Sequence, residues 1–376
     1  MKILKDRRII FVLGNLELGG AERQALILAR HLSEHEHAHV EVWGFNKSGP
    51  VADICDQHGL TSRVIPFRFT GSRSLSFRAL RGVARTLRDA QPDILLPYTF
   101  YPNVVCGLIW KWTGARACVW NQRDEGILPF VSPSIEKAVK RTPHFVSNSE
   151  AGARFLINEL AVSDHQVTVI PNGVESVRPK ADRCAWRERL AVDDAAFVAC
   201  MVANLHLNKD HATVLRAWRM VVNEFASDGR SALLVLAGRH DGAYESLAAL
   251  ASELQLNDHV RFAGPVADVR GLLSAADVSV FSSRSEGCPN AVLESMAAGL
   301  PVAGSDIKGI RDVIGSGGSQ FLAPVGDADT LAKVLLTMAR NPELCTRIGT
   351  ENRERVKNNY DALRMCRDTA TLLAKL

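Results

Sequence analysis

The sequence feature that most constrains the fold lies at 276–304, where two short apolar runs enclose a helical pattern. The first run, 276–282, is rich in β-branched and aromatic residues and too short for a helix, so it predicts a buried strand. Gly287 and Pro289 then interrupt the chain, and apolar residues recur at helical spacing before the second run at 301–304. A strand–loop–helix–strand unit predicts a parallel sheet, in which ligands bind where the strands end.

Two carboxylates belong to this unit. Glu286 lies on the predicted loop at the carboxyl end of the strand, and Glu294 lies on the first turns of the helix. The amides of Asn290, Ala291 and Val292 begin the helix, where unpaired N–H groups suit a phosphate. Acids that reach sugar hydroxyls beside a phosphate-binding helix start indicate a nucleotide-sugar site. Two glutamates eight apart are also common on solvated helices, so the pattern is a hypothesis that its context must support.

Length and composition restrict the class of protein. The 376 residues suffice for two domains of ordinary size, with average apolar and charged content. No apolar run approaches the length that spans a membrane, and the N-terminus leads into a strand at 9–13 rather than into a signal peptide. The eight cysteines form no CxxC pair or framework spacing, which favours a reducing cytoplasm.

A second candidate anion site follows the strand at 9–13. Gly19 and Gly20 precede a helix predicted at 21–31, and two glycines there let the backbone approach a ligand at the positive end of the helix dipole. A tight turn explains the glycine pair equally well. The spacing is not that of a dinucleotide-binding fingerprint, and we expect no such site.

Two patterns raise the question of a metal. The cluster His31, His35, His37 and His39 alternates with acids at a helix–strand junction, which favours a solvated turn over a metal site. Asp327-Ala-Asp329 forms a D-x-D, which holds a cation in metal-dependent transferases, but its place before a helical pattern favours an N-cap. We therefore expect no metal and no cofactor.

The positive charge is concentrated in the first half. Residues 1–178 hold 22 Lys and Arg against 17 Asp and Glu, and the remainder holds 23 against 24. A helix predicted at about 74–90 has an apolar face and a second face made of four arginines, namely Arg78, Arg81, Arg85 and Arg88. This arginine face is either a solvated surface or a contact for anionic lipid head groups at the inner face of the membrane. Nucleic acid is disfavoured, because no base-stacking aromatic motif interleaves these arginines.

The second half supplies further candidates at strand ends. Lys209 follows the strand predicted at 197–203, where a point charge neutralises a leaving diphosphate. A buried strand at 232–237 ends at Gly238 and Arg239. The strand ends and helix starts that we predict to bind a nucleotide sugar comprise Gly19, Gly20, Gly238, Arg239, Pro289, Asn290, Ala291, Val292 and Glu294.

Five segments together resemble the retaining glycosyltransferases of the GT-B fold, family 4 type, also called glycosyl transferases group 1. These are Gly-Gly-Ala-Glu-Arg at 19–23, Pro-Asn-Gly-Val at 171–174, Lys209, the Glu-x7-Glu motif at 286–294, and Ala-Ala-Gly-Leu-Pro-Val at 297–302. The resemblance implies two Rossmann-like α/β domains that face each other across a cleft. It implies an acceptor-side domain at 1–178, a nucleotide-sugar domain at 179–360, and a C-terminal helix at about 361–376 that packs back on the first domain.

The resemblance also implies a chemistry. A sugar would move from a nucleotide donor, expected to be a UDP-sugar, to a glycan or lipid-linked hydroxyl with retention and without a metal, in cell-surface polysaccharide or glycoconjugate synthesis. Lys209 would hold the diphosphate, Glu286 the donor hydroxyls and Glu294 the ribose, while Phe262 would lie near the base. Relatives have a histidine near the position of Arg123, and we count Arg123 as a third catalytic candidate. Relatives also have an arginine where this chain has Asn204.

Two other functions stay open at this level. One is a GT-B nucleotide-sugar epimerase or hydrolase, and the other is a catalytically silent nucleotide-sugar-binding subunit. A silent subunit is expected to lack Glu286 or Lys209, and both are present.

Overall fold

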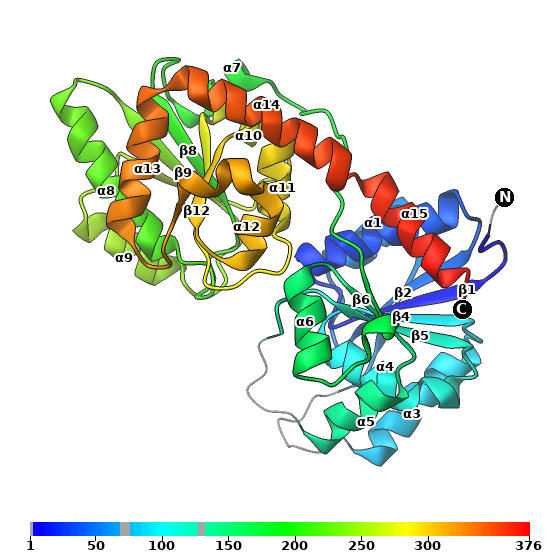
Figure 1. The fold of residues 1–376 in the computed structure, drawn as a ribbon. Helices are drawn as coiled ribbons and strands as arrows, with labels where there is room; N and C mark the ends of the chain where they lie inside the picture. The colour runs from blue at the N-terminus through cyan, green and yellow to red at the C-terminus, as the bar shows by residue number, and fades with distance from the viewer. Residues whose placement is uncertain (1–2, 68–75, 127–131) are drawn as a thin grey trace. The chain divides into compact units, whose positions relative to one another are not determined.

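The protein divides into two compact α/β units. The computed structural model describes residues 3–67, 76–126 and 132–376 (Figure 1). Unit 1 comprises Met1–Gly173 with Ala362–Leu376, and unit 2 comprises Val174–Asp361. The sequence predicted domain boundaries near residues 178 and 361. Both units have a parallel sheet with helices on its two faces, which confirms the predicted fold class.

Unit 1 is built on a sheet of seven parallel strands within the described residues. Their order across the sheet is β3-β2-β1-β4-β5-β6-β7. Parallel pairing needs a crossover between successive strands, and a helical segment supplies most of these crossovers. The strands are β1 Arg8–Leu13, β2 His39–Phe45, β3 Thr61–Ile65, β4 Ile94–Pro97, β5 Ala117–Gln122, β6 His144–Ser147 and β7 Val167–Val169.

The helices of unit 1 cover both faces of this sheet, because alternate strand residues point to opposite sides. Ile9, Phe11 and Leu13 of β1 pack with α1, α2 and α15, whereas Ile10 and Val12 pack with α3, α4 and α5. The helices are α1 Gly20–Glu34, α2 Pro50–Gln57, α3 Phe77–Asp89, α4 Phe100–Thr113, α5 Pro133–Arg141, α6 Glu150–Asn158, the 3₁₀ turn η1 Asp164–Gln166, and α15 Ala362–Leu373.

Unit 2 repeats this architecture with six parallel strands in the order β10-β9-β8-β11-β12-β13. The strands are β8 Phe197–Val202, β9 Ala232–Ala237, β10 Val260–Gly264, β11 Val278–Phe281, β12 Val302–Ser305 and β13 Leu322–Ala323. One face packs against α8, α9 and α13, and the other against α7, α10, α11, α12 and α14. The helical segments are α7 Arg183–Leu190, α8 His211–Ser227, α9 Tyr244–Glu253, α10 Val269–Ala275, α11 Asn290–Ala297, α12 Lys308–Ile314, η2 Ser316–Phe321, α13 Ala328–Arg340 and α14 Pro342–Asn359.

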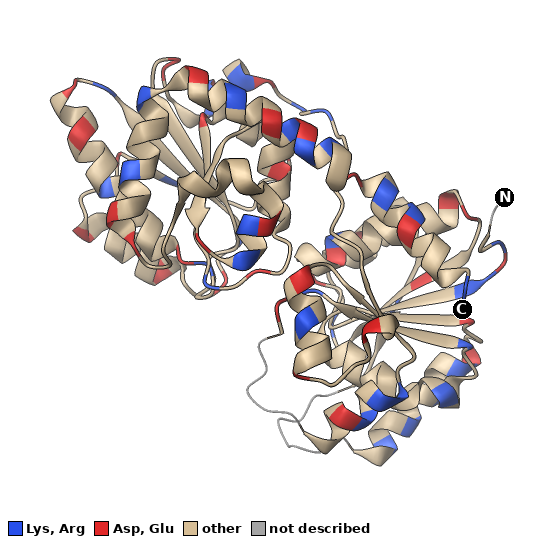
Figure 2. Cartoon of the chain, viewed as in Figure 1, with Lys and Arg blue, Asp and Glu red and all other residues tan. Residues whose placement is uncertain are grey.

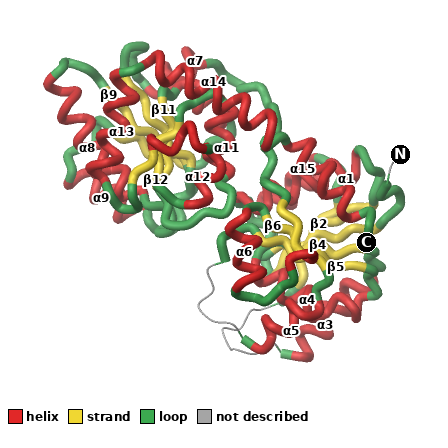
Figure 3. Tube along the Cα trace, in the orientation of Figure 1, coloured by secondary structure: helices red, strands yellow, loops and turns green. Residues whose placement is uncertain are grey.

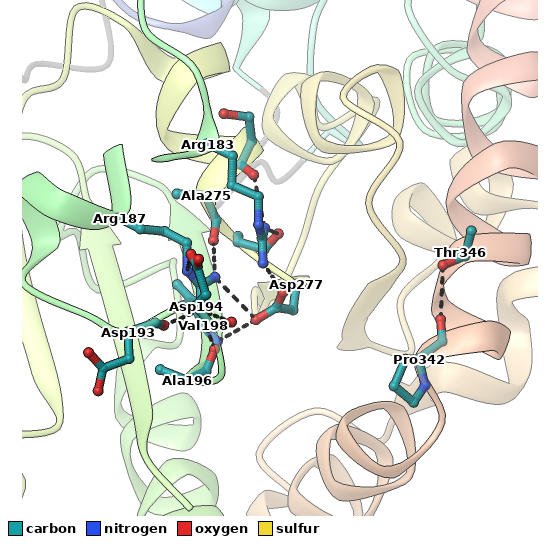
Figure 4. Close-up of polar contacts among 12 residues, drawn as sticks. Arg183, Arg187, Asp193, Asp194, Ala196, Val198, Ala275, Asp277, Pro342 and Thr346 are labelled. Carbon is teal, nitrogen blue, oxygen red and sulfur yellow. Dashed lines mark hydrogen bonds and ion pairs between the residues drawn. The ribbon is translucent and has the colours of Figure 1, made fainter. Parts of the chain in front are cut away.

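The buried Arg187 belongs to a hydrogen-bond network at the amino ends of β8 and β11, the two central strands of unit 2 (Figure 4). The guanidinium of Arg187 is buried and donates to the carbonyl of Ala275 at 2.8 Å. Its partner Asp277 accepts from Arg183 at 2.6 Å and from the amide of Val198 at 2.8 Å. Val198 belongs to β8 and Asp277 directly precedes β11, so this network sets the register of these strands at the edge away from their carboxyl ends. Removing Asp277 would leave the buried guanidinium of Arg187 with carbonyl acceptors and with the carboxylate of Asp194 at 3.9 Å, so we expect a loss of stability.

Three local predictions differ from the structure. The sequence at 319–323 predicts a strand, but only Leu322–Ala323 forms one, because the preceding residues form the 3₁₀ turn Ser316–Phe321. The sequence also offers Asn290 as an N-cap, but Pro289 takes that position without a side-chain cap and Asn290 is the first helical residue of α11. His31 is 8% exposed rather than part of a solvated turn, because it faces inward on the last turns of α1. The cap predicted at Asp327 is present, since its carboxylate accepts from the amide of Thr330 at 2.9 Å.

Candidate functional site

The candidate site of unit 2 lies where the strand order changes direction. From β8 the chain builds outward to β9 and β10 on one side, and from β11 it builds to β12 and β13 on the other. The loops that follow β8 and β11 therefore leave neighbouring strands at the same edge, which is where open α/β sheets bind ligands. Figure 3 shows how such loops alternate with the strands and helices of the unit. Lys209 lies on the first of these loops and Glu286 on the second.

These two predicted residues form an ion pair. Nζ of Lys209 contacts Oε1 of Glu286, and the same oxygen accepts a hydrogen bond from Oγ of Ser283 at 2.9 Å. The lysine side chain is 27% exposed and the glutamate side chain 13% exposed, so the pair is partly accessible to solvent. Nζ of Lys209 also lies 5.2 Å from the ring centre of Phe281, a favourable cation–π distance. The structure thus brings together a cation and a carboxylate 77 residues apart.

Backbone hydrogen bonds tie the two loops together. The amide of Asp210 donates to the carbonyl of Ser282 at 3.1 Å, and the amide of Arg284 donates to the carbonyl of Asn208 at 3.2 Å. His211, which is 1% exposed, places its Nδ1 2.8 Å from the carbonyl of Lys209, and burial lowers the pKa of its imidazole. No sequence pattern points to His211, because a lone histidine two residues after a lysine forms no motif. Its contact fixes the backbone from which the Lys209 side chain extends.

The start of α11 faces the same strand edge. The first helical hydrogen bond joins the amide of Leu293 to the carbonyl of Pro289, so the amides of Ala291 and Val292 have no partner within the helix. Gly309, on the first turn of α12, packs on the Glu286 loop. A β-carbon at that glycine would lie 1.9 Å from the carbonyl oxygen of Glu286, so no other residue fits there without displacing the loop.

Glu294 lies on α11 and interacts electrostatically with Arg270 of α10. Burial lowers the pKa of the Arg270 guanidinium, although the charges of Glu294 and Glu175 oppose this shift. The same guanidinium donates to the carbonyl of Glu175, which lies just after the start of unit 2. The carboxylate predicted to hold a ribose therefore lies in the electrostatic field of a cation that also bonds the segment entering the unit.

Of the remaining predicted residues of unit 2, Asn204 follows β8, Gly238 and Arg239 follow β9, and Phe262 lies within β10. The side-chain oxygen of Asn204 accepts from the amide of Arg239 at 3.1 Å, so Asn204 braces two neighbouring strand ends. A β-carbon at Gly238 would lie 2.1 Å from the carbonyl of Ala203, which explains a glycine where these strands part. Phe262 packs edge-on against Tyr244, with ring centres 5.4 Å apart.

In unit 1, Gly19 is the N-cap of α1, with extended backbone and no side-chain cap. Arg123 follows β5 and is half-buried. Its guanidinium donates to the side-chain oxygens of Asn121 at 3.0 Å and Asn172 at 3.3 Å, and its Cζ lies 4.4 Å from the ring centre of Tyr98. Burial raises the pKa of Tyr98, and the nearby Arg123 acts in the opposite direction. Arg123 is therefore held by a stacked ring and two amide side chains.

The four arginines of α3 point outward. Figure 2 shows Lys and Arg positions recurring along α3. Arg78, Arg81, Arg85 and Arg88 are all exposed, and within the described part of the chain none forms an ion pair with an acid. Arg88 donates through Nε to the carbonyl of Trp112 at 2.7 Å, and Arg81 lies over the exposed ring of Phe77. No helix among the described residues is long and apolar enough to cross a membrane. Among the same described residues, no group of three or more His, Cys, Asp or Glu side chains is arranged so that it could hold a metal ion.

Comparisons with known proteins agree on a family. A model described as glycosyl transferases group 1 matches residues 182–355, and one described as glycosyltransferase family 4 matches residues 18–178. A putative glycosyltransferase of Bacillus subtilis, EpsD, is 35% identical over 45% of this chain and 43% of its own length. An Escherichia coli enzyme named UDP-Gal:alpha-D-GlcNAc-diphosphoundecaprenol alpha-1,3-galactosyltransferase is 25% identical over 60% of this chain and 59% of its own length. The chain thus spans about half the length of these curated relatives.

A solved structure shares the fold over nearly the whole chain. HepE of Anabaena, crystallised with UDP and glucose, superposes with a TM-score of 0.83 at 20% identity, covering 98% of this chain and 100% of the other. At that identity the likeness shows the fold, which is the GT-B fold of its structural neighbours.

Proposed function

The chain belongs to the group 1 glycosyltransferases, since family models match its consecutive segments 18–178 and 182–355, and from this membership we propose that it is a retaining hexosyltransferase. It moves a sugar from a UDP-sugar to a hydroxyl of a glycan or lipid-linked acceptor in the synthesis of a polysaccharide or glycoconjugate. The observation that carries the proposal is the Lys209–Glu286 pair at the point where the strand order of unit 2 reverses.

Each member of this pair has a role that its position supports. Lys209 turns its ammonium from Glu286 to the donor diphosphate and neutralises the charge that develops on the leaving phosphate. The amides at the start of α11 bind the same diphosphate, because a helix N-terminus favours an anion. Glu286 then accepts hydrogen bonds from hydroxyls of the donor sugar. Glu294 binds the ribose beside Arg270.

The reaction needs no protein nucleophile under this proposal. The acceptor oxygen attacks the anomeric carbon on the face that the diphosphate leaves, the bond from that carbon to the phosphate oxygen breaks, and the leaving phosphate takes the acceptor proton. The chain holds the reactants in position and stabilises the developing charge, without a metal. Arg123 is proposed to contact the acceptor or a phosphate, since a guanidinium donates hydrogen bonds but is a poor proton carrier.

The relatives support the choice of substrate class. HepE was crystallised with UDP and glucose, and the E. coli relative is named for a UDP-galactose donor and a diphosphoundecaprenol-linked acceptor. Both names point to a UDP-sugar donor, and one points to an acceptor carried on a lipid. A lipid-linked acceptor would bring the protein to the cytoplasmic face of a membrane.

The first experiment measures thermal stabilisation by UDP, GDP, ADP and dTDP, each with EDTA and with magnesium. A ligand at a hundred times its dissociation constant adds about 2.7 kcal/mol of stability, which is readily measured. Stabilisation by UDP in EDTA is the expected result. Stabilisation by none of the four would remove the proposal in favour of a protein without a nucleotide site. Release of free sugar or of an epimer from a bound UDP-sugar, without acceptor, would identify a hydrolase or epimerase instead.

We also propose that the arginine face of α3, made of Arg78, Arg81, Arg85 and Arg88, contacts anionic lipid head groups. Its support is the exposure of the four side chains and their lack of ion pairs among the described residues. Each basic residue near an anionic surface contributes about 1 kcal/mol.

The test of this contact is co-sedimentation with phosphatidylserine vesicles at low salt. The double variant Arg81→Glu/Arg85→Glu should lose about 2 kcal/mol or more of binding. A control that reverses the charge of two exposed cations of unit 2, Arg216→Glu/Lys333→Glu, should bind as wild type does. Equal losses of vesicle binding in the two variants would indicate a general effect of net charge and would contradict a specific contact by the arginine face of α3.

A further inference from the structure

Ser283 occupies an unusual place behind the Lys209–Glu286 pair. It lies two residues after β11, and its side chain is fully buried at 0% exposure. Its Oγ is 2.9 Å from Oε1 of Glu286, 3.2 Å from the carbonyl of Asn208 and 3.3 Å from the carbonyl of Ser285. A hydroxyl has one proton to donate, and a carboxylate is the strongest of these acceptors. The hydrogen bond to Glu286 is therefore the one that the geometry favours.

Two other serines hold Ser283 in place. Its amide donates to Oγ of Ser305 at 3.1 Å, and that oxygen also lies 3.0 Å from Oγ of Ser282. Ser305 ends β12 and is 3% exposed, and Ser282 is 1% exposed. A buried cluster at the ends of two strands thus fixes the backbone that carries the hydroxyl. The hydroxyl in turn lies between the loop of Glu286 and the carbonyl that precedes Lys209.

The arrangement gives one oxygen of Glu286 two donors. Oε1 accepts from both Lys209 and Ser283. When Lys209 pairs with a diphosphate instead, Oε1 loses its cation while remaining largely shielded from water. An acceptor left without a donor in such a place costs free energy. Ser283 supplies the remaining donor, and it keeps the carboxylate in the orientation that leaves Oε2 for a ligand.

We propose that Ser283 is a positioning residue that holds Glu286 for the donor sugar while Lys209 binds the donor diphosphate. The inference rests on the proposed function, because it assigns the sugar to Glu286 and the diphosphate to Lys209. Ser283 touches no substrate under this proposal. It supports recognition of the sugar through Glu286 but not recognition of the nucleotide. Loss of its hydroxyl should therefore affect a nucleotide sugar and spare the nucleotide.

The experiment compares the affinities of UDP and UDP-glucose by calorimetry in the wild-type protein and in Ser283→Ala. The variant should bind UDP as wild type does and UDP-glucose about tenfold more weakly, which corresponds to about 1.4 kcal/mol. The control is Ser295→Ala. Ser295 is 1% exposed in the same unit, but its hydroxyl donates within its own helix, to the carbonyl of Ala291 at 2.8 Å. It should change neither affinity.

A second variant protects the test against misfolding. Ser283→Cys nearly preserves the side-chain volume and replaces a strong donor by a weak one. It should show the same selective loss in a protein whose melting temperature without ligand equals that of wild type. A folded Ser283→Cys that still favours UDP-glucose over UDP as wild type does would overturn the inference, as would an equal loss of both affinities.

Failure of the proposed function has a different signature. A wild-type protein that binds neither UDP nor UDP-glucose contradicts the proposed donor and the inference together. A wild-type protein that favours UDP-glucose, with serine variants that do so equally, contradicts only the role of Ser283.

Discussion

The two units share one topology and differ in what they place at its centre. In both sheets the strand order reverses beside the first strand of the unit, between β1 and β4 in unit 1 and between β8 and β11 in unit 2. Unit 2 joins two opposite charges there, on Lys209 and Glu286. Unit 1 has the buried Tyr98 after β4, and its nearest cation, Arg123, bonds neutral amides. The fold determines where a site forms, and the residues at the strand ends determine its chemistry.

The largest expected effect belongs to Lys209. Lys209→Ala removes the ammonium that is proposed to neutralise the leaving diphosphate, and one such electrostatic donor lowers the barrier by about 2.7–4 kcal/mol, or roughly 10²–10³ in turnover. The measurement is UDP release from a UDP-sugar with acceptor present. The control Lys333→Ala removes an exposed lysine of α13 in the same unit and should keep wild-type turnover. If Lys209→Ala turns over within a few-fold of wild type, the charged pair of unit 2 has no catalytic role and does not distinguish the two units.

A smaller effect is expected from Arg123, and on a different observable. Arg123→Ala removes the stacking on Tyr98 and the hydrogen bonds to Asn121 and Asn172, together about 2 kcal/mol of stability. Arg123→Lys should lose most of the same amount, because an ammonium lacks the planar fork. Denaturant unfolding measures both. Unchanged stability of Arg123→Ala together with lost turnover would show that this side chain serves the substrate rather than the fold.

The smallest effect concerns pH and unit 1 alone. Burial lowers the pKa of His31, and the charges of His35 and Arg367 act in the same direction while Glu36 and Glu34 oppose them. The unfolded chain then takes up a proton on this histidine at a higher pH than the folded chain. Wild type should lose stability as the pH falls below about 6.5, the ordinary value for histidine.

His31→Gln removes that proton uptake. As the pH falls from 7.5 to 5.5, the melting temperature of His31→Gln should rise relative to that of wild type. The control His58→Gln, at an exposed histidine of the same unit, should follow wild type. A constant difference between His31→Gln and wild type across this range would mean that His31 is protonated equally in both states.

Local patterns predicted the fold and much of the site. Apolar runs and their breaks at Gly287 and Pro289 located the strand–loop–helix unit, and the position of Asp327 before a helical pattern gave its cap. Strand ends were enough to place Lys209 and Glu286 at one sheet edge, since parallel strands end together. The predicted roles of the site residues remain proposals.

Long-range and inward-facing contacts could not be predicted in the same way. The hydrogen bond from Ser283 to Glu286 joins residues close in sequence, but its importance depends on the burial of Ser283 and on the amide bond to Ser305 across the sheet. Neither the burial of Ser283 nor its amide hydrogen bond to Ser305 corresponds to a recognisable sequence pattern. His31 lies among polar residues that suggest a surface turn, and only the packing of the helix end places it inside.

The return of the last helix to unit 1 has a consequence for protein engineering. Four residues of α15 are buried in the core of unit 1, namely Met365, Cys366, Ala370 and Leu373. Unit 1 is therefore not a continuous segment of the gene. A chimaera that takes unit 2, where the donor site is proposed, from another member of the family must keep residues 362–376 with their own N-terminal half. Otherwise one face of the first sheet acquires a foreign helix, and a change in donor preference could not be separated from a poorly packed core.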